Sequence, residues 1–522
     1  MNNEQPIGRG PLDIDELLRA VAQSAPDDVA MSDGQRSVTW GELDQRINRI
    51  ARSLIARGVS PGDNVATLGS NSVAYVEVML ATIRAGACAV PLSSYVTAKT
   101  RAAMVRDSGS RLLFVSALYE TEMRALARDM GLANSDVLPL DDAFLAEFML
   151  RMPDRPLPTE FSLDRGFNLI YSSGTTGIPK GIIQSRRYRA FESDSVRSRF
   201  GLSRQTRTIV ATPLCSNTTL FLLTAVLSAG GSLILMEKFD TGAWLGLAER
   251  WRPTDVVLVP VQYRRLLDHP EFDRFDLSSL RNKFCTSAPM PARTKAEILE
   301  RWPAGGFNEL YGMTEGGVGA TLRAHEHPGK LDTVGVANPG VEMFVIDEAD
   351  HVLSPGKVGE LVGRSPSMMS GYHGREKETA EASWFDAEGR RFQRSGDNGW
   401  FDADGFLHLL DRKKDVIISG GFNVYAIDLE NVLMQHPDVA EVAVIAAPSP
   451  EWGETPVAYA VLRAETPPES IRLWANERLG KFQRITKVIA TEELPRSPIG
   501  KVLKRELRES LMKSSSTPKS LS

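Results

Sequence analysis

The sequence predicts an α/β fold in which a large N-terminal domain, made of layered α/β subdomains plus a small β-rich subdomain, is followed by a small mobile α+β C-terminal domain. Three observations support this. A chain of 522 residues is longer than one hydrophobic core usually serves, so at least two domains are expected. Before about Gly335, short apolar runs alternate with stretches of helical periodicity, which is typical of a largely parallel sheet. After it, short runs separated by Gly, Pro and Asp predominate, until strand and helix signals mix from Asp411 onward.

The first well-marked helix starts at a capping box. Thr39 supplies the hydroxyl of the N-cap, and Glu42 follows three residues later. Behind them, apolar residues recur at helical spacing from Leu43 to Ile55, and Gly58 supplies a stop signal. We therefore expect an amphipathic helix that begins next to Thr39.

Strands and helices then alternate along the N-terminal domain. Residues 64–68 read as a buried strand, about 72–85 as a helix, and 86–92 as the next strand. The same rhythm returns in four further apolar runs. These are 208–212, 232–236, 255–259 and 283–286.

The remainder of the chain has a different texture. Strands are expected at 341–347 and 359–362 in the β-rich subdomain, and helices at 426–436 and 471–479 in the C-terminal domain. The last ten residues, 513–522, are rich in Ser, Lys and Pro, and we expect them to be disordered.

Composition narrows the classes of protein. A net charge of -5 argues against a general nucleic-acid or anionic-membrane surface. The three cysteines are far apart and suggest neither a disulfide framework nor a zinc site. The longest apolar stretch, 221–235, is short and is interrupted by Gly230-Gly231, so no membrane span is expected. No signal peptide or peroxisomal Ser-Lys-Leu terminus is visible, which makes the cytoplasm the expected location.

The run Tyr171-Ser-Ser-Gly-Thr-Thr-Gly-Ile-Pro-Lys-Gly181 is the most informative local motif. Apolar residues flank it on both sides, so a strand, a tight loop and a second strand are expected. Glycine allows backbone N–H groups to approach an anion closely, and a lysine adds a positive charge, so a polyphosphate is the expected guest. The spacing fits neither a P-loop nor a dinucleotide fingerprint. The residues expected to bind phosphate are Ser172, Ser173, Gly174, Thr175, Thr176, Gly177 and Lys180.

This run resembles the phosphate loop of the AMP-forming adenylating enzymes, a superfamily that includes acyl-CoA synthetases, peptide-synthetase adenylation domains and firefly luciferase. Five further motifs resemble signatures of that superfamily and occur in its order, and together they are most like those of an acyl- or aryl-CoA ligase. They are Tyr311–Glu315, Gly359–Tyr372, Arg394–Asp397, Asp411–Tyr425 and Leu494–Lys504.

The resemblance implies a domain organisation. Residues 1–410 would form the adenylate-forming domain, built from layered α/β subdomains plus the β-rich subdomain. Residues 411–414 would be a hinge, centred on Lys414, and residues 415–512 a mobile lid domain. Such lids commonly rotate between two functional positions.

The resemblance also assigns the nucleotide site. Tyr311 would stack on adenine beside Gly312, with Ser287 and Ala288 on the adenine-side loop. Thr314 would contact the α-phosphate. A carboxylate suits a hard cation, and Glu315 would hold Mg²⁺. Asp397 and Arg412 would contact the ribose hydroxyls.

In the C-terminal domain, the resemblance makes Lys501 the lysine of the first half-reaction, alongside Thr314 and Lys180. The loop that lines the pantetheine tunnel of CoA would contain Ser419, Gly420, Gly421 and Phe422. Arg484, Lys487, Lys504 and Arg505 make this end of the chain basic. That basic character fits either the phosphates of CoA or a solvated helix face.

The acid-binding pocket follows by the same resemblance. Its predicted residues are Cys215, Ser216, Asn217, Gln262, Gly316, Gly317 and Val318. Many relatives carry an aromatic-His pair where Cys215 and Ser216 stand. No Asp lies between 211 and 227 to hold an α-amino group, so an aromatic, arylalkanoic or medium-chain acid is expected. The nearby Arg264 and Arg265 keep a dicarboxylate open.

The resemblance implies an ATP-dependent, AMP-forming carboxylic acid–CoA ligase. A carboxylate attacks the α-phosphorus of MgATP, and the CoA thiol then displaces AMP from the acyl-AMP. The absence of an Asp-Ser carrier motif after the C-terminal unit favours CoA, but a stand-alone ligase that loads an acyl-carrier protein stays open. So do the rarer luciferase-type oxygenase and a non-catalytic nucleotide-binding regulator. The sequence does not decide the oligomeric state, and a homodimer stays open.

Overall fold

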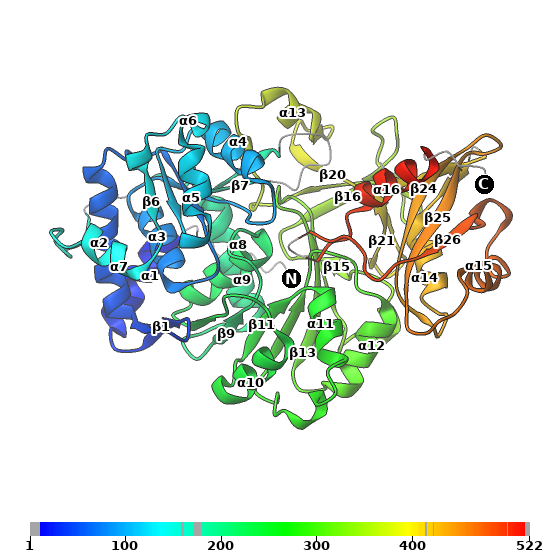
Figure 1. Cartoon of the computed structure of the whole chain (residues 1–522), viewed down its shortest axis with the longest axis horizontal. Helices are drawn as coiled ribbons and strands as arrows, with labels where there is room; N and C mark the ends of the chain where they lie inside the picture. The colour runs from blue at the N-terminus through cyan, green and yellow to red at the C-terminus, as the bar shows by residue number, and fades with distance from the viewer. Residues whose placement is uncertain are drawn as a thin grey trace, which may run out of the picture.

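The computed structural model describes residues 11–157, 161–171, 179–412, 415–420, 422–497 and 500–516. The N-terminal helices lie at one side of the molecule and the C-terminal domain at the other, with β16, β20 and β21 between them (Figure 1). Two large sheets and two smaller ones make up the strands of this part of the chain.

The first large sheet has the strand order β18-β8-β7-β4-β3-β5-β6. Its strands are β3 (Asn64–Leu68), β4 (Cys88–Pro91), β5 (Leu112–Val115), β6 (Val137–Pro139), β7 (Gly166–Tyr171), β8 (Gly181–Ser185) and β18 (Gly371–Tyr372). Strands β3 to β7 run parallel, whereas β8 returns antiparallel to β7. The strands expected on both sides of the phosphate run are therefore present.

The second large sheet has the order β15-β14-β13-β12-β11-β9-β10-β1-β2. Its strands are β1 (Val29–Ser32), β2 (Ser37–Thr39), β9 (Arg207–Val210), β10 (Ser232–Leu235), β11 (Asp255–Leu258), β12 (Asn282–Cys285), β13 (Gly306–Gly312), β14 (Gly319–Arg323) and β15 (Val336–Ala337). Its inner strands from β13 to β1 are parallel. The four later strands predicted in this domain match β9 to β12 within two residues at each end.

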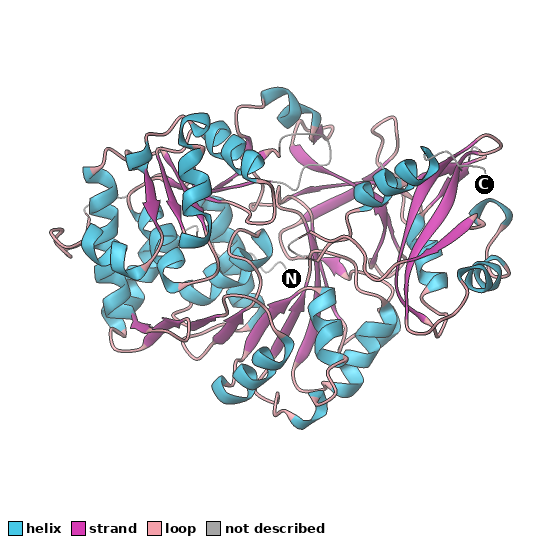
Figure 2. Ribbon diagram, viewed as in Figure 1, coloured by secondary structure: helices cyan, strands magenta, loops and turns pink. Residues whose placement is uncertain are grey.

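Helices fill the space between the two sheets and cover their outer faces, as the ribbon in Figure 2 shows. The inner layer consists of α1 (Ile14–Ser24), α2 (Trp40–Ala56), α3 (Val73–Arg84), α8 (Arg186–Phe200) and α9 (Asn217–Ser228). Thr39 and Glu42 form the predicted capping box of α2. The largest core cluster joins these helices to strands of both sheets.

The two outer layers are separate. One consists of α4 (Ala98–Ser108), α5 (Ala117–Ala125) and α6 (Ala127–Met130), the other of α10 (Thr241–Trp251), α11 (Pro260–Leu267) and α12 (Ala292–Arg301). Helix α7 (Asp142–Phe148) contacts α2. This alternation of helix and sheet layers confirms the predicted layered α/β architecture.

The β-rich subdomain is a five-stranded antiparallel sheet. It consists of β16 (Glu342–Ile346), β17 (Gly359–Arg364), β19 (Ser383–Phe385), β20 (Arg391–Phe401) and β21 (Leu407–Arg412), with α13 (Glu376–Glu381) beside it. The C-terminal domain follows as an α+β unit. It consists of β22 (Ile417–Ser419), β23 (Phe422–Val424), α14 (Ala426–Leu433), β24 (Val439–Ser449), β25 (Gly453–Leu462), α15 (Pro468–Asn476), β26 (Lys487–Ala490) and α16 (Lys504–Ser516). The remaining short turns are the 3₁₀ helices 134–136, 272–274, 328–330 and 481–483.

Several boundaries differ from the sequence expectation. Helix α15 begins at Pro468, three residues early, because proline suits the first helical turn. Helix α14 ends at Leu433 instead of His436. Helix α16 continues to Ser516, so disorder does not begin at 513 as predicted; residues 517–522 of the expected tail lie outside the described part of the chain.

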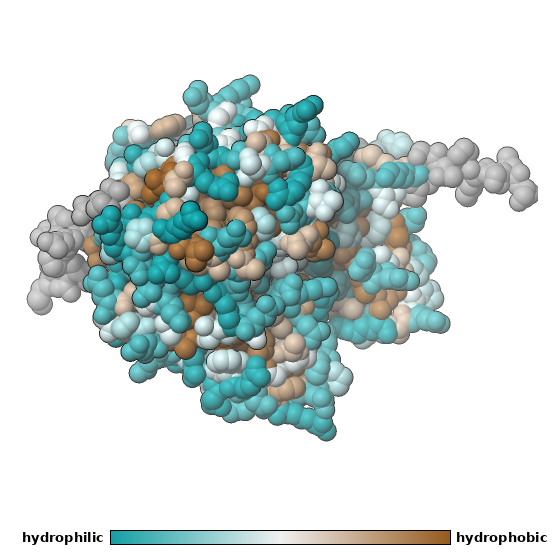
Figure 3. All heavy atoms as spheres, turned by 60° about the vertical axis from the view of Figure 1, so that its left-hand side comes forward, coloured by the Kyte–Doolittle hydropathy of each residue, from teal (hydrophilic) through white to brown (hydrophobic). Residues whose placement is uncertain are grey.

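The surface agrees with the composition. On the face shown in Figure 3, hydrophilic residues predominate and hydrophobic ones occur in separate groups. Within the residues that the structure describes, no helix combines the length and the apolar character that a membrane span requires.

Candidate nucleotide and acyl site

The carboxyl ends of the parallel strands of the nine-stranded sheet meet at one edge, and the predicted acyl-pocket and adenine-side residues lie at or after these ends. Cys215 to Asn217 come after β9, and Gln262 comes after β11. Ser287 and Ala288 come after β12, and Tyr311 lies at the end of β13. Ligand sites of open α/β sheets are found outside the carboxyl ends of the strands. The sheet therefore gathers residues that are far apart in the sequence.

The three residues predicted around adenine and ribose form one polar cluster. The Tyr311 hydroxyl donates to Asp397 Oδ2 at 2.9 Å, and Arg412 Nε lies 3.2 Å from Asp397 Oδ1. Asp397 on β20 and Arg412 on β21 are direct cross-strand partners. Burial and the neighbouring Asp397 carboxylate raise the pKa of Tyr311, so its phenol stays protonated. The cluster offers an aromatic ring, a carboxylate and a guanidinium side by side.

A buried ion pair connects the predicted adenine-side loop to strand β13. Ser287 has a φ of 81°, which is unusual for a residue with a side chain, and its hydroxyl lies 2.6 Å from that of Thr218. Glu309, on β13, accepts a hydrogen bond from Met290 N at 2.9 Å and pairs with Lys295 of α12. Burial raises the pKa of Glu309, and Lys295 opposes that shift. The loop is thereby fixed to the strand that presents Tyr311.

The predicted phosphate and metal residues meet at Tyr372. The Tyr372 hydroxyl donates to Glu315 Oε1 at 2.9 Å, and Lys180 Nζ lies 4.8 Å from the centre of the Tyr372 ring. The carbonyl oxygen of Thr314 accepts a hydrogen bond from Gln184 Nε2 at 2.7 Å. The other predicted phosphate-loop residues, Ser172, Ser173, Gly174, Thr175, Thr176 and Gly177, lie outside the described residues.

Glycine is required at the turn after Glu315. Gly316 and Gly317 have φ values of 70° and 82°. A Cβ atom on Gly316 would lie 1.9 Å from the Ser367 carbonyl oxygen, and one on Gly317 would lie 2.6 Å from Gln393 Cβ. Val318, which follows, is buried. The turn therefore packs tightly against the segment that precedes β18.

Asn217 belongs to a buried polar network. Its Oδ1 accepts from Gln184 Nε2 at 3.1 Å and from Arg189 Nη2 at 2.6 Å. Arg189, on α8, is completely buried and also bonds to Asn168, Gln184 and Glu192. Asn217 itself is partly exposed, so its amide links the predicted acyl pocket to this buried cation.

Two residues near the pocket, Gln262 and Arg264, already have hydrogen-bond partners within the protein. Gln262 is buried and uses its amide to hold backbone groups of Val259 and Ala211, which stabilises the ends of β11 and β9. Arg264 makes two hydrogen bonds to Glu297, at 2.6 and 3.0 Å, and a third to Asp268. Because Arg264 already binds carboxylates of the protein, it gives no support to a dicarboxylic acid as the substrate.

Cys215 and Ser216 complete the predicted set. Burial raises the pKa of the Cys215 thiol to about 11, so this thiol is protonated at neutral pH. Ser216 is the N-cap of α9, and its hydroxyl accepts a hydrogen bond from Thr218 N at 3.2 Å. The Ser216 side chain thus has a local structural partner.

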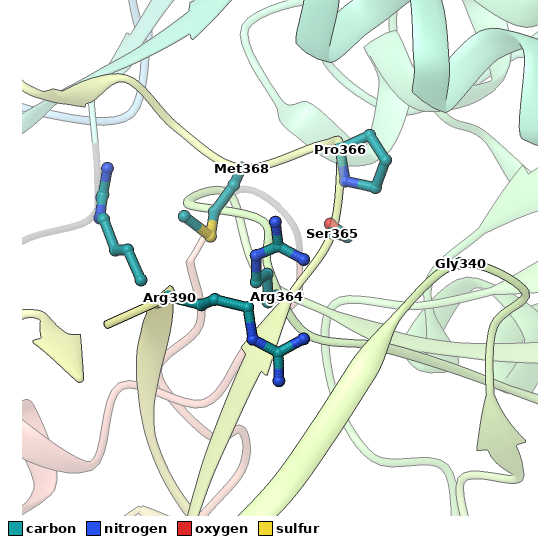
Figure 4. Close-up of a pocket in the computed structure, with 7 residues that line it drawn as sticks. Gly340, Arg364, Ser365, Pro366, Met368 and Arg390 are labelled. Atoms are coloured by element: carbon teal, nitrogen blue, oxygen red, sulfur yellow. The ribbon is translucent and has the colours of Figure 1, made fainter. Parts of the chain in front are cut away.

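A cavity of about 440 Å³ lies behind the glycine turn. Figure 4 shows Arg364 and Arg390 reaching into it below Met368, and Met368 also contacts the Gly317 position. Its positive charge is compensated, because Glu342 bonds to Arg364 at 2.9 Å and to Arg390 at 3.1 Å. We do not assign this cavity to the nucleotide.

The turn that carries Lys501 lies against the N-terminal domain. A Cβ atom on Gly500, whose φ is 73°, would lie 2.8 Å from Val261 Cγ1 and 3.3 Å from Val259 Cγ2. Val259 directly follows β11, so this contact is at the carboxyl edge of the sheet. Ser497 braces the turn, since its hydroxyl accepts from Lys501 N at 3.1 Å and its own N–H donates to Lys501 O at 2.7 Å.

Comparison with known proteins agrees with this geometry. Residues 18–373 match the family model of the AMP-binding enzyme, and residues 428–501 match that of the AMP-binding enzyme C-terminal domain. The chain belongs to the AMP-binding enzyme family. This confirms the predicted membership among adenylating enzymes and the predicted enzyme class, an AMP-forming acid–thiol ligase.

Three relatives of this AMP-binding enzyme illustrate the similarity. A feruloyl-CoA synthase of Amycolatopsis sp is 34% identical over 93% of this chain and 96% of its own. The fatty acid–[acyl-carrier-protein] ligase ScoC of Streptomyces coeruleorubidus is 31% identical, covering 94% of each chain. The crystal structure of ATP-bound MatB from Rhodopseudomonas palustris superposes with a TM-score of 0.87 at 29% identity, covering 96% of this chain and 99% of that one.

The predicted CoA-binding loop of this AMP-binding enzyme lies within the C-terminal domain. Ser419 is buried, whereas Phe422 is exposed and stacks on Phe482 with ring centres 4.2 Å apart. Gly420 faces Trp452, whose ring lies 2.8 Å from where a Cβ atom would be, and Lys481 lies nearby. Gly421 and the hinge residue Lys414 lie outside the described residues.

Two of the four basic residues at the C-terminal end are paired with carboxylates of the protein. Lys504 is largely buried, pairs with Glu430 at 2.8 Å and lies 3.6 Å from Asp411. Arg505 is exposed and pairs with Glu509 along its own helix. Lys504 thus anchors α16 to the segment next to the hinge.

Three residues near this site had no role assigned from the sequence: Tyr372, Arg189 and Glu309. Tyr372 stands in a quoted motif, but nothing local indicates that it meets Glu315 and Lys180. Helix α8 carries several arginines, of which Arg186 and Arg189 are buried, and helical spacing alone does not distinguish these two from the others. Glu309 is the one charged residue of strand β13, and a charged residue in a mostly buried strand is a sequence signal of a buried partner.

Proposed function

We propose that this enzyme is an ATP-dependent carboxylic acid–CoA ligase whose acid is aromatic, arylalkanoic or a medium-chain fatty acid. The observation that carries the proposal is the placement of the Lys501 turn against Val259 and Val261. Gly500 directly precedes Lys501 and contacts the segment after β11, which supports a role for Lys501 beside the predicted nucleotide residues. Lys501 would add a positive charge to the one supplied by Lys180.

The proposed first half-reaction uses positioning and charge. The carboxylate oxygen of the acid forms a bond to the α-phosphorus of ATP, and pyrophosphate leaves. Lys180 and Lys501 stabilise the charge on the transferring phosphoryl group, and Thr314 contacts its oxygens. Tyr311, Asp397 and Arg412 hold the nucleoside. The enzyme needs no nucleophile of its own because the substrate carboxylate is the nucleophile.

Glu315 is the proposed metal ligand. Among the described residues, no group of three or more His, Cys, Asp or Glu side chains could hold a metal ion by itself. Mg²⁺ usually takes one or two carboxylates together with substrate phosphates and water, so a single carboxylate facing ATP fits it. When bound, Mg²⁺ would neutralise charge on the phosphates.

The residues predicted to line the pocket support the proposed class of acid. Its predicted lining is small and mostly apolar around Gly316, Gly317 and Val318, which leaves room for a ring or an alkyl chain. Asn217 adds one polar contact at the side of α9. The relatives named for feruloyl-CoA and fatty-acid chemistry support both alternatives.

CoA is the proposed thiol. The exposed ring of Phe422 stacks on Phe482. Lys481 Nζ lies 5.7 Å from the centre of the Trp452 ring and 5.8 Å from the centre of the Phe482 ring. Exposed aromatic rings beside a cation suit a purine and its phosphates. In the second half-reaction, the CoA sulfur would bond to the acyl carbon and AMP would leave.

The proposed ligase is tested by acid-dependent release of pyrophosphate from ATP. The panel contains aryl, arylalkanoic, fatty and dicarboxylic acids, each with and without CoA. We expect one monocarboxylic class to respond and CoA to yield AMP plus a thioester. Bound ATP with no pyrophosphate release across the whole panel would instead favour a non-catalytic regulator.

A second acceptor is supported by a specific observation, the similarity to the acyl-carrier-protein ligase ScoC. A carrier protein bearing phosphopantetheine presents the same thiol arm as CoA. If an acid drives adenylation and CoA adds nothing, the same assay with a phosphopantetheinylated carrier protein distinguishes the two acceptors.

A further inference from the structure

One short segment links several of the described residues at the predicted phosphate site. Residues 369–375, here called the brace, run from Met369 through β18 to Arg375. Strand β18 pairs antiparallel with β8, the strand that directly follows Lys180. His373 N donates to Gly181 O at 2.7 Å, so the brace is fixed to the last residue of the phosphate motif.

The brace also reaches the first residue of that motif. The Tyr171 hydroxyl donates to Asp107 Oδ2 at 2.8 Å, and Arg375 Nη2 donates to Asp107 Oδ1 at 2.9 Å. Asp107 is three-quarters buried, so these charge-assisted bonds are shielded from water. Tyr171 and Gly181 are the two ends of the phosphate run. Both are therefore tied to one segment.

The third set of contacts is with the predicted metal ligand. Met369 N donates to the Glu315 carbonyl oxygen at 2.7 Å, and the Tyr372 hydroxyl donates to the Glu315 carboxylate at 2.9 Å. The face of the same Tyr372 ring lies 4.8 Å from Lys180 Nζ, within the range of a cation–π interaction. One side chain thus contacts both charged groups that would meet the phosphates.

We propose that Tyr372 is a positioning residue that sets Glu315 for Mg²⁺ and Lys180 for the phosphates of ATP. This inference rests on the proposed nucleotide site. The phenol occupies one carboxylate oxygen of Glu315 and leaves the other for the metal. The ring restricts the flexible lysine side chain, and it does so without a conventional hydrogen-bond acceptor that would compete with ATP for the ammonium group.

The chemistry of the phenol suits this role. A tyrosine hydroxyl is a hydrogen-bond donor, and that of Tyr372 already donates to the Glu315 carboxylate. Backbone bonds hold the tyrosine in place, because Tyr372 N donates to Thr379 Oγ1 at 2.9 Å. A donor held in this way orients a carboxylate before the metal arrives.

The test is calorimetric binding of α,β-methylene-ATP to the full-length enzyme, with excess Mg²⁺ and with EDTA. It needs no knowledge of the acid. Tyr372→Phe removes the hydroxyl and keeps the ring, so we expect MgATP-analogue affinity to fall about 3- to 10-fold while the EDTA value changes less than about 2-fold. Tyr372→Leu also removes the ring and should lower the EDTA value as well, by about 2- to 5-fold.

Tyr459→Phe is the matched control. It removes a phenol that donates to Leu507 O at 3.3 Å in the C-terminal domain, and both affinities should stay at the wild-type value. If wild-type binding depends on Mg²⁺ and Tyr372→Phe keeps that dependence, or binds more tightly, this inference alone is overturned. If wild-type binding does not respond to Mg²⁺, the metal assignment of the proposed function fails with it.

Discussion

At the residue scale, the site depends on a few side chains whose partners are distant in the sequence. Tyr311 makes a hydrogen bond to Asp397, which lies 86 positions away in the sequence, and Tyr372 makes one to Glu315, which lies 57 positions away. The motifs predict these residue types because glycine, lysine and carboxylate are the groups that phosphate and metal chemistry requires. Which atom meets which was decided by strand pairing.

Lys501 offers the sharpest residue-scale prediction. Lys501→Ala should abolish adenylation, because losing one electrostatic contact to a transition state typically costs about 10²–10³ in rate, and this lysine supplies a full charge. Thioester formation from supplied acyl-AMP should continue at the wild-type rate. The two half-reactions are measured separately, as pyrophosphate release and as thioester formation.

Lys377→Ala is the control for that experiment, since its side chain is 86% exposed and lies 3.9 Å from Glu381 of its own helix. Equal loss of both half-reactions in Lys501→Ala would contradict the role given to this lysine.

At the element scale, glycines and ion pairs determine how loops and helices pack. The Lys501 turn needs glycine at 500 for two separate reasons, its φ of 73° and the contact with Val261. Helix α16 is anchored through Lys504 and Arg508 to the two sides of the hinge, Asp411 and Asp415. Movement of the hinge and movement of α16 are therefore linked.

Gly500→Ala should slow adenylation about tenfold, because the added methyl group overlaps Val261 when the turn is docked and overpacking of this kind costs about 1–3 kcal/mol. The second half-reaction should be unaffected, since it does not need this docking. Gly389→Ala is the matched control, with a φ of 74° but no atom within 4 Å of the new methyl group. If both variants behave alike in stopped-flow pyrophosphate release, backbone strain and not docking is responsible.

The buried carboxyl group of Asp411 should make the free energy of unfolding depend on pH. Burial raises its pKa to about 6, with Lys504 opposing, whereas an unfolded Asp titrates near 3.9. The folded state therefore holds this proton more tightly, and its stability falls as the pH rises from about 4 to about 6. Asp411→Asn cannot ionise, so it should gain about 1–3 kcal/mol relative to wild type over that interval.

The measurement is the difference in free energy of unfolding between Asp411→Asn and wild type, by urea titration at pH 4.5 and pH 7.5. A difference that does not change with pH would show that Asp411 titrates normally.

At the scale of the whole molecule, one small domain has to serve two half-reactions. Here Lys501 docks on the N-terminal domain, while the Phe422 loop packs within the C-terminal domain against Phe482. Both cannot face the acyl group at once, so rotation of residues 415–512 about the hinge is the expected solution.

Lys414→Pro tests that rotation, because proline fixes φ near -65°. Adenylation should persist and thioester formation from the bound acyl-AMP should stop. Lys414→Ala, which keeps backbone freedom, should retain both. Normal overall turnover by the proline variant in a coupled AMP assay would rule out a hinge at this position.

The sequence by itself determined the local features and the class of protein. The capping box at Thr39, the strands around the phosphate run and the layered α/β pattern follow from hydrogen bonding and periodicity within short segments, and the ordered motifs indicated an adenylating enzyme. Only the tertiary structure showed that Arg375 and Asp107, 268 positions apart, bind each other beside that run. It also showed that Arg189 and Lys504 are buried. Such contacts depend on which strands pair and which helix faces pack, and no short segment contains that information.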